Sequence, residues 1–142
     1  AIVGPVAAVR GATTIAAAAG TAVPLGIWAD DDARYTSGTN APLRNPPPPV
    51  AITWSKYRGP GPVTFANTRP ELRVTRGGEV AEPFSGWGST TATFSTPGEY
   101  VLHALVTDYS GPGGNGEVCC WTTTMVRVTV SPPASDGAVA RR

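Results

Sequence analysis

Residues 97–108, which read PGEYVLHALVTD, contain the clearest strand of the chain. Between Glu99 and Thr107 every second residue is apolar, and successive side chains of a strand point to opposite faces. The predicted inward-facing residues are Tyr100, Leu102, Ala104 and Val106. A Pro-Gly turn precedes this strand, and Asp108 ends it. The stretch therefore predicts a strand with one buried face.

Similar short runs, separated by Gly and Pro clusters, lie on both sides of this strand. The inward positions expected in three of them are Val23, Leu25, Ile27 and Ala29, then Ile52 and Trp54, then Val126, Val128 and Val130. Further strands are expected over 13–18, 63–66, 72–74 and 90–95. No segment has a helical period for more than a turn or two. This pattern is typical of an all-β sandwich or barrel.

The composition fits one domain. A chain of 142 residues buries a real core without metals or several disulfides, and its charged fraction of 15% is low against an average of about 25%. We expect an irregular leader over 1–12, a β-sandwich over 13–130 and a polar tail over 131–142. A long connection over 33–49 ends in four consecutive prolines, which form a stiff segment expected to lie over the surface.

Several of these motifs together resemble the bacterial extracellular immunoglobulin-like and polycystic-kidney-disease-like modules. They are ITWS at 52–55, GPGPVTF at 59–65, ATF at 92–94, PGEYVL at 97–102 with Asp108, and VRVTV at 126–130. The resemblance implies an immunoglobulin-like sandwich of about seven antiparallel strands. It also implies that Trp54 is the core tryptophan and Tyr100 the tyrosine-corner residue. Leu25 and Leu102 stand where antibody domains have a disulfide, so the core is expected to be apolar.

Charge and hydropathy bear on the class of partner. The net charge is only +1 and the basic residues are dispersed, which argues against a nucleic-acid partner. No apolar run of about 18 residues is present, so no transmembrane segment is predicted. The Ala-rich start without an initiator Met favours an exported mature protein, periplasmic or extracellular. The frequent Ala, Gly, Pro and Arg, with one lysine and no glutamine, suggest a bacterial source with a GC-rich genome.

Two motifs that suggest chemistry are better explained by structure. Gly111, Gly113 and Gly116 match the dinucleotide-binding pattern, but a strand follows them in place of the helix that must receive the pyrophosphate. His103 is the only histidine, and no serine has the context of a nucleophile, so a structural or partner-facing role is favoured. The chain is therefore not expected to be an enzyme.

The adjacent Cys119 and Cys120 leave three alternatives open. Neighbours in a regular strand point to opposite faces, so they cannot bond to each other without a distorted turn. The alternatives are two free thiols with Cys120 inward, a vicinal disulfide at a bulge, and an intermolecular bridge or ligand attachment.

An acidic cluster is the only predicted metal site. Asp30, Asp31 and Asp32 are expected to end one strand and Asp108 another, and in an immunoglobulin-like sandwich the loops that follow these strands lie at the same end. Carboxylates gathered there would suit calcium, although aspartates commonly stop strands without binding a metal. No other cofactor is predicted.

Three tryptophans exceed what the core needs. Trp28 is out of phase with the inward residues of its strand, Trp87 is expected in a loop, and Trp121 lies in the last predicted strand, near 118–130. Exposed tryptophan is enriched at protein contacts, so these residues either bind a partner or cap the edges of the core.

The sequence therefore predicts a non-catalytic structural or interaction module. It would be an accessory subunit that binds protein partners within a larger envelope or membrane complex. The alternative is a carbohydrate- or calcium-binding accessory module of a secreted enzyme.

Overall fold

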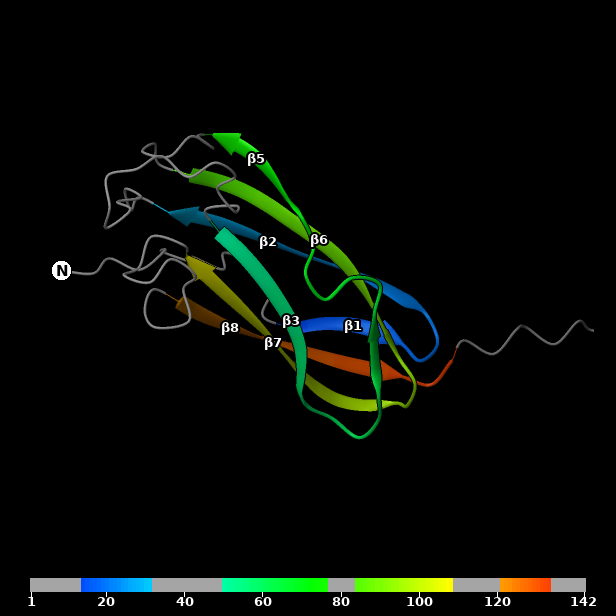
Figure 1. The fold of residues 1–142 in the computed structure, drawn as a ribbon. Helices are drawn as coiled ribbons and strands as arrows, with labels where there is room; N and C mark the ends of the chain where they lie inside the picture. Colours follow the sequence, from blue (N-terminus) through cyan, green and yellow to red (C-terminus); the bar gives the residue numbers. More distant parts are fainter. Residues whose placement is uncertain (1–13, 32–49, 77–83, 109–120, 134–142) are drawn as a thin grey trace, which may run out of the picture.

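The computed structural model describes residues 14–31, 50–76, 84–108 and 121–133 and is all-β within them (Figure 1). Its strands are β1 (Thr14–Ala18), β2 (Ala22–Asp31), β3 (Val50–Arg58), β4 (Val63–Phe65), β5 (Leu72–Arg76), β6 (Phe84–Phe94), β7 (Gly98–Asp108) and β8 (Trp121–Ser131). The connection over 33–49, the Gly-rich motif, the whole predicted leader over 1–12 and the outer part of the predicted tail, 134–142, lie outside the described residues.

The strands form two sheets, as predicted for a sandwich. Sheet A has the order β1-β8-β7-β3, and sheet B has β6 between β2 on one side and β4 with β5 on the other. All pairings are antiparallel except that of β1 with β8, which is parallel. The described residues thus form eight strands with one parallel pair, whereas about seven antiparallel strands were expected.

The inward positions predicted from the alternation are buried between the two sheets. Of these positions, Trp54 is 2% exposed, Tyr100 is 1% exposed and Leu102 is fully buried. The other members of the core are Ala19, Val23, Leu25, Ile27, Ala29, Val50, Ile52, Ala92, Phe94, Ala104, Val106, Val126, Val128 and Val130. The period-two pattern therefore predicted the inner faces of β2, β3, β7 and β8 correctly.

The placement of Trp87 in a loop was wrong. β6 begins at Phe84 rather than near Thr90, and Trp87 lies within it, paired with Trp28 of β2. Gly86 and Gly88, which flank Trp87, face the core and are buried. A Cβ at Gly88 would lie 2.8 Å from Cδ1 of Ile52, so glycine is needed there for packing and not for a turn.

Two turns interlock at the end of the sandwich where β7 begins. Gly59 has a φ of +147° and its Cα lies over the ring of Tyr100, while Pro60 packs against Gly98 of the facing turn. The hydroxyl of Tyr100 donates a 2.8 Å hydrogen bond to the carbonyl of Thr96, which is the bond a tyrosine corner makes. The GPGPVTF and PGEYVL motifs are thus in direct contact.

We expect Tyr100→Phe to lower the free energy of unfolding by about 1–2 kcal/mol, because it removes a partly buried hydrogen bond and leaves the Thr96 carbonyl without this donor. The ring of Tyr100 stays in its edge contact with Phe94, where the centroids are 4.8 Å apart. Urea unfolding of the two proteins measures the difference. An unchanged midpoint would show that the corner bond does not stabilise the fold.

Candidate functional site

The outer face of sheet A has an uncharged centre. The register of β3, β7 and β8 places side chains there in successive rows, namely Ala51, Thr107 and Trp121, then Thr53, Leu105 and Thr123, then Ser55, His103 and Met125. None of these residues is Asp, Glu, Lys or Arg. Trp121 is 54% exposed and Met125 is 42% exposed, so large apolar side chains meet solvent in this centre.

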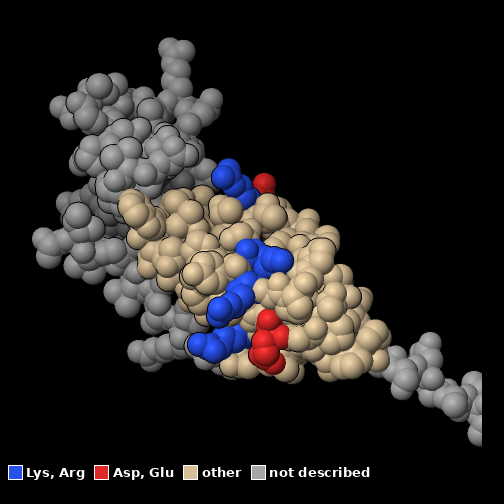
Figure 2. All heavy atoms as spheres, turned by 90° about the horizontal axis from the view of Figure 1, so that it is seen from below, with Lys and Arg blue, Asp and Glu red and all other residues tan. Residues whose placement is uncertain are grey.

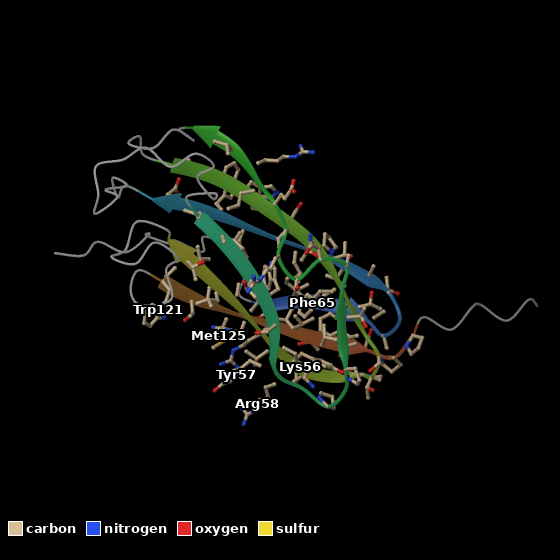
Figure 3. The ribbon with its side chains drawn as sticks, viewed as in Figure 1. Lys56, Tyr57, Arg58, Phe65, Trp121 and Met125 are labelled. Carbon is tan, nitrogen blue, oxygen red and sulfur yellow. The ribbon has the colours of Figure 1, made fainter. Side chains whose placement is uncertain are left out.

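A bulge in β3 adds Arg58 to this face beside Tyr57. The register of β3 with β7 shifts between Lys56 and Arg58, so Arg58 lies opposite Val101, an outward residue. The extra residue of a bulge bends the strand and changes where its side chains point. Tyr57 is 68% exposed, and Figure 3 shows Tyr57 and Arg58 on the same side of the molecule as Met125 and Trp121.

Charged side chains flank the uncharged centre at the end where β3 has its bulge. Arg58, Val101 and Arg127 form the next row of the face, and Glu99 follows Val101 on β7. Glu99 accepts a 3.1 Å hydrogen bond from the hydroxyl of Thr129, which holds its carboxylate over β8. Figure 2, seen from below, shows a broad uncharged area beside a band of basic and acidic side chains.

His103 lies in the middle of this face. It is partly buried, its Nδ1 is 3.4 Å from the hydroxyl oxygen of Ser55, and Met125 is its neighbour on β8. His103 therefore faces outward, as predicted, and the row that contains it has no carboxylate. Its structural or partner-facing role stays a prediction.

Trp28 and Trp87 form a second aromatic site on the outer face of sheet B. They are cross-strand partners, and their ring centroids are 5.3 Å apart with a tilt of 50°. Trp28 is 54% exposed, the same fraction as Trp121. The surplus tryptophans thus lie on opposite sheets, Trp121 on one and the pair on the other, and their role in partner contact stays a prediction.

The predicted calcium ligands are divided between the sheets. Asp30 and Asp31 are the last two residues of β2 in sheet B, while Asp108 ends β7 in sheet A. The carboxylate of Asp30 accepts a hydrogen bond from the hydroxyl of Ser85 on β6. Among the described residues, no group of three or more His, Cys, Asp or Glu could hold a metal ion. Asp32, Cys119 and Cys120 lie outside the described residues, so calcium and the three cysteine alternatives stay predictions.

Sequence reasoning did not select Met125 and Tyr57 as functional residues. The alternation along 121–130 does place Met125 on the exposed face, so its exposure was predictable from the period. The same period places Tyr57 on the outer face, since Thr53 and Ser55 lie there, whereas the position of Arg58 depends on the bulge, for which the sequence of β3 gives no signal.

The comparisons with known proteins add no assignment. No protein-family model, no curated protein and no solved structure matches the chain. Within the ranges that the structure describes, no helix is long and apolar enough to cross a membrane. The fold therefore defines the class, an all-β sandwich, and the function has to be inferred from its two outer faces.

Proposed function

We propose that this chain is a non-catalytic interaction module that binds a protein partner through the outer face of sheet A. The observation that carries the proposal is the uncharged centre with Trp121 and Met125 exposed in it. The centres of protein interfaces lack charged residues and are enriched in aromatic residues, Met and Arg, whereas their rims are polar.

The face has the layout of such an interface. Each of the four rows holds an apolar side chain from β7 or β8, and these are Trp121, Leu105, Met125 and Val101 in order, with the exposed Tyr57 at the bulge of β3. Arg58 and Arg127 lie at the edge of this area, where arginine forms polar contacts with a partner. A backbone of paired strands holds all of these side chains, so little conformational freedom is lost when a partner binds.

The proposal includes an immunoglobulin-like identity and an exported location. The buried Trp54 on β3 and the tyrosine corner at Tyr100 support the first. The resemblance to bacterial extracellular modules supports the second, in the periplasm or outside the cell. In this setting the chain is an accessory subunit of an envelope or membrane complex.

We expect the double variant Trp121→Thr/Met125→Thr to lose its partner while the fold is retained, because both side chains are exposed and threonine suits a strand. Alanine scanning commonly finds that a central Trp contributes about 2 kcal/mol or more to binding, which is a loss in affinity of about thirtyfold. The measurement is native co-purification from envelope fractions, with mass spectrometry and the molar ratio of each recovered protein.

Val74→Ser is the matched control, since Val74 is 51% exposed but lies on β5 of sheet B. A defined complex recovered in a fixed ratio with the wild type and with Val74→Ser, and absent with the double variant, supports the proposal. Equal recovery with all three proteins, or recovery of the wild type as a lone monomer, would overturn it.

A further inference from the structure

Trp87 lies flat over Gly26 on the outer face of sheet B. A Cβ at Gly26 would lie 3.0 Å from Cε2 of Trp87 and closer still to Cζ2 and Cη2, so only glycine leaves room for the indole. Trp28 lies beside Trp87 and is tilted by 50° to it. The two indoles thus form an aromatic corner in which the Trp87 ring covers the Gly26 backbone and Trp28 is 54% exposed.

Gly26 weakens the strand in which it lies. Glycine inside a strand is less stable than alanine there, and it often marks a site where another group approaches closely. In β2 the approaching group is the ring of Trp87. A tryptophan pair that only stabilised sheet B would not require this glycine, because cross-strand aromatic pairs stabilise a sheet between ordinary neighbours. The glycine therefore keeps the Trp87 indole against β2, although it makes the strand itself less stable.

Polar groups flank the aromatic corner on two sides. Asp30 follows Trp28 on the same face of β2, and Ser85 of β6 donates a hydrogen bond to its carboxylate. Arg73 of β5 is the cross-strand partner of Trp87 on the other side and is exposed. A carboxylate that accepts hydrogen bonds and a guanidinium that donates them are therefore available beside the indoles.

We propose that this corner, formed by Trp28, Trp87 and Gly26 with Asp30 and Arg73 beside it, binds a pyranose ring of a neutral glycan. The C–H groups on one face of a pyranose are weakly positive and stack on the negative face of an indole. The ring hydroxyls then donate to Asp30 and accept from Arg73. Asp30 and Arg73 both disfavour a purely apolar ligand, and Arg73 disfavours a cation.

This site is independent of the outer face of sheet A, because it lies on the other sheet. The test is affinity gel electrophoresis of the wild type in hydroxyethyl cellulose, xylan and laminarin, with dissociation constants from the dependence on polysaccharide concentration. We expect at least one polysaccharide to retard the protein. Trp28→Ala and Trp87→Ala should each weaken binding about tenfold or more, a loss in the range for removal of one stacking ring.

Gly26→Ala tests the geometry without removing an aromatic ring. Its methyl group displaces the Trp87 indole, so we expect weaker glycan binding and an altered near-UV circular dichroism spectrum in a protein that is still folded. Trp121→Ala is the control, because it removes a tryptophan of the same 54% exposure from sheet A and should bind glycan as the wild type does.

Three results would overturn the proposal. They are no retardation by any of the polysaccharides, equal retardation of Trp28→Ala and the wild type, and retention on immobilised polyproline, in place of glycan, that Trp28→Ala abolishes. None of these results bears on the co-purification experiment, so the two proposals fail or hold separately.

Discussion

Trp54→Ala is expected to lower the free energy of unfolding by about 3–5 kcal/mol, the usual loss when a large aromatic side chain is removed from a core. Trp54 is 2% exposed and is among the largest fully buried side chains of the chain. Since domains are typically stable by only about 5–15 kcal/mol, the variant should be largely unfolded well below the temperature at which the wild type melts. Urea unfolding followed by far-UV circular dichroism measures the loss.

Trp54→Phe separates the two contributions of this side chain. The indole Nε1 of Trp54 is buried, and it has no hydrogen-bond partner among the residues that the structure describes. A buried donor without a partner costs about 1–3 kcal/mol, so its removal offsets part of the lost packing. We therefore expect a loss of about 1–2 kcal/mol. A loss equal to that of Trp54→Ala would mean that the N–H is satisfied in solution.

Gly59→Ala is expected to destabilise the protein by about 2–5 kcal/mol, for two reasons that add. At a φ of +147° an alanine is strained, and its Cβ would lie 2.7 Å from Cγ and Cε1 of Tyr100 and closer to Cδ1. Tyr100 then has to move, and it loses its bond to Thr96. Urea unfolding gives the free energy, and near-UV circular dichroism reports the displaced ring.

Gly20→Ala is the matched control for the clash. Gly20 also has a positive φ, +79°, but a Cβ there meets no atom within 4 Å. Only the left-handed backbone is penalised in this variant, by about 1–2 kcal/mol. If Gly20→Ala and Gly59→Ala were equally unstable, contact with Tyr100 would add nothing, and the two turns would not interlock as described.

The alternation of side chains made the inner faces predictable, but not the pairing of the strands. Val126, Val128 and Val130 were assigned to the core because burial on one face imposes a period of two on any strand. The parallel pairing of β1 with β8 depends on contacts between residues that are far apart in the sequence, such as Thr14 and Arg127. No local sequence pattern predicts such contacts.

The first half of β6 was not predicted, because its glycines serve packing and not a turn. Glycines at 86 and 88 indicate a turn when the sequence is considered alone, because glycine is the usual turn residue. In the structure both glycines are buried, and a Cβ at Gly88 would crowd Ile52 and Leu72. Because Trp87 was assigned to a loop, its pairing with Trp28 and the aromatic site on sheet B were not predicted.

The parallel register of β1 and β8 determines how the sandwich responds to tension. β1 is the first and β8 the last of the described strands. Both run in the same direction, with Thr14 beside Arg127 and Ala18 beside Ser131. A pull on Thr14 and an opposite pull on Ser131 therefore slide one strand along the other. Under such shear the hydrogen bonds of the pair carry the load together, whereas strands peeled apart lose them one at a time. We therefore expect the β1–β8 pair to withstand a larger pull between Thr14 and Ser131 than an antiparallel pair of the same length would.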